Sequence, residues 1–339
     1  MGGNALKNCE TRRIPAADYH ELCKKVIADI GEITPGLRPV VIPSYRTKED
    51  FGDMDVLVYS EHMSSGFLDK ICEKWKSKER VSNGGCHSLE LNGFQIDIIT
   101  APADEFRFAL AYFSWNDLGN LMGRVAHKMG LKFGHDGLYY ALRDGTNHLE
   151  EVQIITHPDV AISWLGFNLE RWYKGFDTLE EIFEFVAANP YFNPDIYLFD
   201  NMNAVSRIRD KKRKTYNAFL AWCETYKEQN PDRVYYSFPA KSSWLPKLRE
   251  EFPVFDILLT RAHQDQAWRD YLKTKFNGRM IQEATGLEGE ELGRFIQQVY
   301  RAIGGKGSTQ ATNWIIDTTP QDKADFVRAQ LSIFKSSLV

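Results

Sequence analysis

Two spacings of apolar residues divide the front half of the chain into helices and strands. Between Ala17 and Ile30 apolar side chains recur every three or four positions, which predicts a helix that ends near Gly31. Shorter apolar or alternating runs between turn residues predict strands. The predicted strands are residues 40–42, 53–59 and 81–99, the last interrupted by turns at 83–85 and 92–93, with a helix at 65–78 before it.

A second helix and a small sheet are predicted further along the chain. From Asn116 an apolar stripe at helical spacing runs to Met129, behind a polar residue that can cap the helix. The polar residues Asn120, Arg124 and His127 share another face of this helix. Short strands are predicted at residues 131–133, 138–142 and 151–155, with turns at His135-Asp136-Gly137 and Asp144-Gly145.

Helices dominate the pattern after about Gly175. A capping box at Thr178 and Glu181 predicts the start of the first of them, and Pro320 at a first helical position predicts the start of the last. We therefore expect an α+β fold with a mixed β-sheet in front, a second small sheet, and a helical carboxy-terminal part. The expected boundaries lie near residues 105 and 175, and no repeat or low-complexity linker marks them.

Composition sets limits on the class of protein. With 339 residues, of which 43% are hydrophobic and 26% charged, the chain should fold into two or three compact units. No apolar run approaches the ~20 residues that cross a bilayer, and no signal peptide is present, so we expect a cytoplasmic protein without a membrane partner. Because the net charge is only −4, contact with nucleic acid would need a local basic surface. Nothing in the sequence indicates the oligomeric state.

Three aspartates stand out in the predicted strands. Asp53 and Asp55 are two positions apart, so both point to one face of their strand while the apolar residues beside them point to the other. Asp97 is a lone acid in an apolar strand. Like charges on one face repel unless a cation lies between them, and carboxylate oxygens suit Mg²⁺. A turn residue at Asp53 and solvent-facing acids at the other two positions would explain the same pattern without chemistry.

The surroundings of these acids carry a family resemblance. Ser44-Tyr45-Arg46 followed by Gly52-Asp53-Met54-Asp55-Val56-Leu57 resembles the nucleotidyltransferase signature of the family X DNA polymerases, within the DNA polymerase beta superfamily. Phe94-Gln95-Ile96-Asp97 is similar to the family's third-carboxylate strand. Residues 112–117, Asn120, Arg124 and residues 130–133 are similar to the nucleotide-binding helix and hairpin of its thumb. The resemblance covers roughly residues 38–170.

The resemblance implies a fold and a metal-dependent activity. It implies a nucleotidyltransferase palm with an amino-terminal helix at residues 1–105, an α/β thumb at 106–175 and a helical nucleic-acid-binding domain at 176–339. Asp53 and Asp55 would ligate two Mg²⁺ ions, with Mn²⁺ as the alternative metal, and Asp97 would ligate the catalytic ion and help deprotonate an attacking 3′-hydroxyl. The enzyme would add nucleotides from a nucleoside triphosphate to a nucleic-acid 3′ end and release pyrophosphate.

The resemblance also implies contacts with the substrates, outside the metal site. The implied contacts are Ser44 and Arg46 with the triphosphate, Tyr112 and Phe113 with the sugar and base, Asn120 with the base edge, and Arg124 with the template or nascent base pair. Without the motif, the aromatic pair would be read as core and the polar helix face as solvated. The acceptor would be DNA or RNA, and the donor a dNTP or an NTP.

The carboxy-terminal half adds two candidate nucleic-acid contacts. Six basic residues fall inside one predicted helix and would grip a phosphate backbone, or form a solvated face: Arg207, Arg209, Lys211, Lys212, Arg213 and Lys214. Lys275-Phe276-Asn277-Gly278-Arg279 followed by Gly286-Leu287-Glu288-Gly289 and Leu292-Gly293 resembles the helical tail of CCA-adding tRNA nucleotidyltransferases. That likeness implies a tail that holds the acceptor strand. A plain helix pair explains the same residues without a function.

Two other functions fit the same residues. Since only about forty residues precede the predicted sheet, we expect no counterpart of the family's amino-terminal lyase domain, which suggests nucleotidyl transfer to a protein or a small molecule instead. Pro43 stands where the family has a glycine, and proline has no amide hydrogen to offer a phosphate. This suggests a non-catalytic nucleic-acid-binding module. The three aspartates favour an enzyme.

Overall fold

The computed structural model describes residues 5–63, 66–144 and 147–336. The chain divides into two compact units, residues 1–253 and 254–339. Both boundaries expected from the sequence, near residues 105 and 175, fall inside the first unit. Within the described residues, no helix has the length and apolar character needed to span a membrane.

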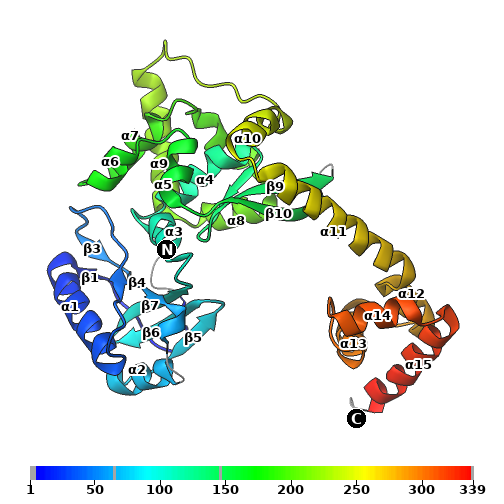
Figure 1. Cartoon of the computed structure of the whole chain (residues 1–339). Helices are drawn as coiled ribbons and strands as arrows, with labels where there is room; N and C mark the ends of the chain where they lie inside the picture. The colour runs from blue at the N-terminus through cyan, green and yellow to red at the C-terminus, as the bar shows by residue number, and fades with distance from the viewer. Residues whose placement is uncertain (1–4, 64–65, 145–146, 337–339) are drawn as a thin grey trace. The chain divides into compact units, whose positions relative to one another are not determined.

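A five-stranded mixed sheet forms the first part of the first unit (Figure 1). Its order is β2-β4-β7-β6-β5, in which β4 and β7 run parallel and the other neighbours run antiparallel. A separate two-stranded ribbon pairs β1 with β3. The strands are β1 (Ile14–Pro15), β2 (Val40–Val41), β3 (Asp50–Phe51), β4 (Asp53–Tyr59), β5 (Arg80–Asn83), β6 (Cys86–Leu91) and β7 (Phe94–Ala101).

Helices on the two faces of this sheet decide where polar side chains can point. On one face α1 (Ala16–Ile33) and α2 (Phe67–Trp75) pack against the alternate residues Met54, Val56 and Val58 of β4. On the other face α3 (Phe106–Phe113) covers Leu57. Asp53 and Asp55, nearer the start of β4 on that face, instead line a cavity. The helix expected at 65–78 is shorter at both ends, and its predicted first residue lies outside the described residues.

The second sheet has three antiparallel strands in the order β10-β9-β8. These are β8 (Leu131–Phe133), β9 (Leu138–Asp144) and β10 (Asn147–Ile155), and they follow α4 (Leu118–Lys128). The predicted turn at 135–137 is confirmed, while Gly145 of the second predicted turn lies outside the described residues. β10 begins before the predicted Glu151, because its early residues extend the pairing with β9.

Helices make up the rest of the first unit. They are α5 (Pro158–Trp164), α6 (Leu169–Lys174), α7 (Leu179–Ala187), α8 (Ala204–Lys211), α9 (Lys214–Gln229) and α10 (Leu245–Glu251), with short 3-10 turns η1 (Ser60–His62), η2 (Pro194–Tyr197), η3 (Phe199–Asn201) and η4 (Lys241–Trp244). The cap predicted at Thr178 is confirmed, since its side chain accepts a hydrogen bond from the amide of Glu181. The prediction that residues 207–214 form one helix is wrong. α8 ends at Lys211, and the extended Arg213 precedes α9.

The second unit is a helical bundle around its own core. Its helices are α11 (Phe255–Lys275), α12 (Gly278–Thr285), α13 (Gly289–Ala302), α14 (Thr309–Asp317) and α15 (Pro320–Ser336). Phe295 and Val299 of α13 are fully buried in that core, and Val327 of α15 packs with them. The helix pair expected at 275–293 is present as α12 and α13, and the start predicted for the last helix is confirmed at Pro320.

Candidate metal centre and substrate cleft

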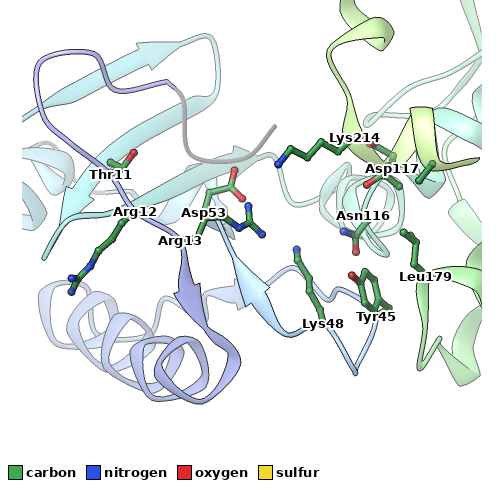
Figure 2. Close-up of a pocket in the computed structure, with 13 residues that line it drawn as sticks. Thr11, Arg12, Arg13, Tyr45, Lys48, Asp53, Asn116, Asp117, Leu179 and Lys214 are labelled. Atoms are coloured by element: carbon green, nitrogen blue, oxygen red, sulfur yellow. The ribbon is translucent and has the colours of Figure 1, made fainter.

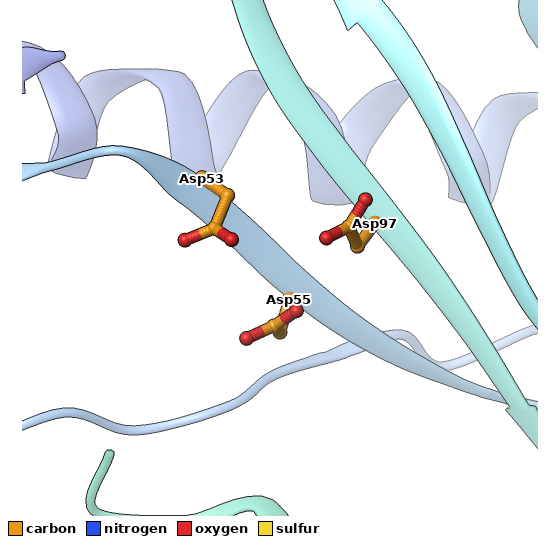
Figure 3. A group of neighbouring side chains, drawn as sticks. All are labelled: Asp53, Asp55 and Asp97. Carbon is orange, nitrogen blue, oxygen red and sulfur yellow. The ribbon is translucent and has the colours of Figure 1, made fainter. Parts of the chain in front are cut away.

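The structure brings Asp53, Asp55 and Asp97 together. β4 carries the first two on the face opposite α1 and α2, and the parallel pairing of β4 with β7 sets Asp55 directly beside Asp97 (Figure 3). One ligand atom from each of the three residues lies within 4.8 Å of the others. Within the described residues, this is the one group of three or more acidic, histidine or cysteine side chains so arranged. A parallel register of two short strands is therefore enough to build the cluster.

The electrostatics of the cluster fit a divalent cation. Burial raises the pKa of Asp55 well above its usual range, and the nearby charges of Asp53 and Asp97 raise it further. Burial also raises the pKa of Asp97, although hydrogen bonds from Ser88 and Gln95 offset part of that shift. The amide of Gln95 lies 2.9 Å from both carboxylate oxygens of Asp97 and fixes their orientation. The three carboxyls offer only oxygen ligands, which suit Mg²⁺ or Mn²⁺. Their ionisation is unfavourable without a cation, and a bound divalent ion would favour it.

Lys48 is a cation beside this cluster that the sequence analysis did not assign to the site. Its ammonium lies 4.4 Å from the centre of the Phe51 ring. Burial lowers the pKa of Lys48, while the carboxylates of Asp53 and Asp55 act in the opposite direction. A lysine held between a buried environment and two acids is typical of a functional site. Its only signal in the sequence is its place in the loop before β4, two residues after Arg46.

A cleft joins the acids to basic groups from distant parts of the first unit. One cavity of about 340 Å³ includes Ser44, Asp55 and Phe113 in its lining. A second cavity, of about 480 Å³, is lined by further basic residues (Figure 2). The two cavities share Lys48 and Asp53, so they adjoin. The side chains of Lys48 and Lys214 extend toward Asp53 from two sides. The basic residues that line the second cavity are Arg12, Arg13, Lys48 and Lys214.

The turn between α3 and α4 contributes Asn116 to the lining of this cleft. Trp115 and Asn116 have φ angles of 64° and 62°, a left-handed conformation that asparagine tolerates but a bulky residue such as tryptophan rarely adopts. The amide of Trp115 donates to the carbonyl of Pro43 at 2.8 Å, which ties the turn to the loop before β4. Asn116 lines both cavities, and its buried Oδ1 has no hydrogen-bond partner within the described parts of the chain. Strained residues of this kind persist at binding sites, where a ligand can satisfy the free atom.

The two residues expected at the triphosphate lie in different places. Ser44 lines the smaller cavity together with Asp55. Arg46 lies outside both cavities, where its guanidinium contacts Asp177 at 2.5 Å and the carbonyl oxygen of Lys174. These contacts fasten the loop before β4 to the connection between α6 and α7. The cation beside the acids is therefore Lys48 and not the expected Arg46. The path of this loop decides which of the two reaches the acids, and the sequence pattern does not reveal that path.

Of the two α3 residues expected to contact the sugar and base, Phe113 lines a cavity beside the acids and Tyr112 lines neither cavity. Phe113 lines the smaller cavity beside Asp55. Tyr112 packs edge-on against Phe113, with ring centres 5.2 Å apart, and against Phe133 at 5.7 Å. A Cβ on Gly119 of α4 would lie 2.2 Å from the carbonyl oxygen of Tyr112, so α3 and α4 approach each other as closely as only glycine allows.

The polar face of α4 is covered by α8. Arg124 is only 8% exposed and forms an ion pair with Asp210, which is fully buried. Asn120 accepts a hydrogen bond from Arg209 at 2.9 Å. Burial alone would raise the pKa of Asp210, but its hydrogen bonds with Arg209 and Arg124 hold that pKa below its usual range. The structure therefore does not bring Asn120 or Arg124 into the cleft with the acids.

The basic cluster around α8 is only partly available to a partner. Arg213 forms ion pairs with Asp117 and, at 3.7 Å, with Asp210, and it lines the smaller cavity. Arg209 is held by Asp210 at 2.7 Å. The remaining contacts are Arg207 with the carbonyl of Met202 at 3.2 Å and Lys211 with the Phe199 ring at 5.7 Å, while Lys212 is exposed. The break after Lys211 follows from these contacts, since an extended Arg213 can reach both acids.

No protein-family model and no curated protein matches this chain. The assignment of a function must therefore depend on the acids, the cleft and the cations around it.

Proposed function

We propose that the chain is a metal-dependent nucleotidyltransferase that adds nucleotides from a nucleoside triphosphate to a nucleic-acid 3′ end and releases pyrophosphate. The observation that carries the proposal is the cluster of three carboxylates, two of which, Asp53 and Asp55, line a cleft that Lys48 and Lys214 also line. Phosphoryl transfer requires acids that can hold a divalent cation and, across from them, basic groups that can hold phosphates. In this proposal the five-stranded sheet serves as the palm, and α3, α4 and the small sheet serve as the thumb.

The three aspartates would hold the metal ions. Asp53 and Asp55 would ligate both ions, and Asp97 would ligate one of them from the neighbouring strand. When bound, the ions would supply positive charge to the phosphates and to the attacking hydroxyl. The fit is supported by the shared orientation of the carboxylates and by the raised pKa values of Asp55 and Asp97.

The other residues of the cleft would bind and orient the nucleotide. Lys48 and Lys214 would contact the triphosphate from two sides, and Asn116 Oδ1 would accept a hydrogen bond from the base or the sugar. Phe113 would pack against the sugar. Asp97 would accept the proton of the attacking 3′-hydroxyl, because a carboxylate with a raised pKa is a better base than an ordinary one.

An acceptor screen tests this function. Labelled dNTPs and NTPs are incubated with the protein, Mg²⁺ and primed duplex, single-stranded or tRNA acceptors, and extended products are resolved by length. We expect incorporation that EDTA and Asp55→Asn abolish, and that the exposed control Asp69→Asn in α2 leaves unchanged. Absence of incorporation on every acceptor would contradict the proposal.

A second acceptor class is favoured by one observation. Because α8 covers the polar face of α4, a polynucleotide strand has no access to Asn120 and Arg124 in this arrangement. The acceptor would then be a protein or a small molecule that enters the cleft alone. Label that appears on protein and on no polynucleotide would favour this version. Metal-dependent turnover that is lost in Asp55→Ala would eliminate a non-catalytic binding module.

A further inference from the structure

A second candidate site lies in the second unit, on the surface of α11. Trp268 and Tyr271 are one helical turn apart and stack on each other, with ring centres 5.5 Å apart and ring planes 23° apart. They are 47% and 43% exposed, although each could bury a large apolar area. Two stacked, exposed rings on a helix offer a flat aromatic platform to a partner.

Lys275 connects this platform to a cavity. Its ammonium lies 5.3 Å from the centre of the Tyr271 ring, and the residue also lines a cavity of about 620 Å³. The cavity lies where the ends of α11 and α14 meet the start of α15. Its apolar wall includes Met280 and Ile316, which are 39% and 42% exposed. An opening of this size, beside a platform, can receive a planar group.

A buried cation also lines the cavity. Lys323 of α15 is only 6% exposed, and its ammonium donates one hydrogen bond, of 3.3 Å, to the carbonyl oxygen of Lys275. An ammonium carries three donors, so two remain for a ligand within the described part of this unit. Burial lowers the pKa of Lys323, and the charge of Lys275 lowers it further. Both effects would be relieved by an anion in the cavity.

We propose that these residues form a binding site for single-stranded nucleic acid, with bases stacked on Trp268 and Tyr271 and a phosphate beside Lys275 and Lys323. Aromatic side chains accept bases of any sequence, because every base has a flat face, and neighbouring cations neutralise the backbone. An apolar protein surface would bury the rings but leave the buried ammonium of Lys323 without an anion, whereas a nucleic-acid strand supplies both flat bases and phosphates. Only the identification of the ligand as a nucleic-acid strand rests on the proposed function, since an enzyme that extends a 3′ end must bind its acceptor strand.

Binding is measured on the full chain in EDTA, where no transfer can occur, so that failure of this site and failure of the proposed activity are scored separately. The probe is a labelled oligodeoxythymidylate, followed by fluorescence anisotropy, and a strand of the same length with abasic sites replaces it in a second titration. We expect the abasic strand to bind roughly fivefold or more weakly, because base stacking is lost. Lys323→Met should weaken the binding of both strands.

Variants of the platform make the test specific. The double variant Trp268→Ala, Tyr271→Ala should lose roughly tenfold or more in affinity for the base-bearing strand and little for the abasic one. Phe at both positions should restore binding, because it keeps the rings and removes their polar groups. The matched control Tyr173→Ala removes a tyrosine that is 55% exposed in the first unit and should bind like the unmodified chain.

Three outcomes would overturn the site. The first is equal affinity for the two strands, and the second is unchanged affinity in the double Ala variant whose thermal unfolding matches that of the unmodified chain. The third combines two results. Neither the unmodified chain nor the double Ala variant binds either strand, and the unmodified chain self-associates whereas the variant is a monomer. This last result would assign the platform to contact between copies of the chain.

Discussion

Asp55→Asn is expected to stabilise the metal-free protein while it abolishes activity. The ligand oxygens of the three aspartates lie within 4.8 Å of one another. Two unit charges at that distance repel by about 3 kcal/mol at an effective dielectric constant of ~20. The raised pKa values of Asp55 and Asp97 mean that protonation relieves part of this repulsion. Removal of one acid should therefore add about 1–2 kcal/mol to the free energy of unfolding at neutral pH.

The sign of the pH dependence follows from the direction of the pKa shift. A carboxyl whose pKa is higher in the folded state than in the unfolded state binds more protons when folded, so its ionisation destabilises the fold as pH rises. Asparagine cannot ionise. The advantage of Asp55→Asn should therefore be large at neutral and alkaline pH and should vanish at acid pH, where the carboxyl of Asp55 is protonated in both states.

Thermal unfolding in EDTA measures this effect. For a unit of about 250 residues, 1 kcal/mol moves the midpoint by roughly 2–4 °C, so a gain of about 1–2 kcal/mol should raise the transition of the first unit by about 2–8 °C. Asp69→Asn in α2 serves as the matched control, because its carboxylate forms an exposed ion pair with Arg80 and should change the midpoint little. A lower midpoint for Asp55→Asn in EDTA at alkaline pH would refute the reasoning, since the acids would then not repel.

Three further predictions concern the same unit. Saturating Mg²⁺ or Mn²⁺ should stabilise the unmodified chain by about 2–3 kcal/mol at a hundredfold excess over Kd, with an affinity that rises with pH because protons compete for the carboxyls; an equal gain in Asp55→Asn would place the ion elsewhere. Lys48→Met should raise the KM for the nucleoside triphosphate roughly tenfold or more, and steady-state kinetics with an unchanged KM would remove Lys48 from the triphosphate site. Gly119→Ala should destabilise the unit by about 2 kcal/mol or more in denaturant unfolding, because its Cβ would meet a carbonyl oxygen at 2.2 Å. The control Gly31→Ala, with open space around its Cβ, should be neutral or stabilising. Similar effects of the two changes would argue against the close contact of α3 and α4.

The elements that local pattern controls could be predicted from the sequence. The two-residue spacing of Asp53 and Asp55 fixed their common face, and the apolar run around Asp97 identified a neighbouring strand. The cluster needed one further condition, the parallel register of β4 and β7, which the predicted strands allowed. Helix starts with a side-chain cap, such as that at Thr178, were equally accessible because the cap is local.

The cations of the cleft were not accessible in the same way. Lys48 reaches the acids through the path of its loop. Lys214 belongs to the basic run identified from the sequence as a candidate phosphate contact, but it lies far along the chain, so no spacing connects it with Asp53. The single basic helix predicted at 207–214 fails for a related reason. Tertiary ion pairs of Arg213 with Asp117 and Asp210 outweigh the local preference for a continuous helix.

Asp210 lies outside the cleft, yet its buried carboxylate helps to hold one wall of the cleft in place. Three guanidinium groups surround it, and one of them, Arg213, reaches on to Asp117 at the cleft. Loss of this single negative charge would remove the ion-pair partner of Arg124 and Arg209, leave Arg213 with Asp117 alone, and free the wall to shift. Among randomly mutated chains, inactivating changes should therefore gather at position 210 as well as at the three aspartates proposed to hold metal ions.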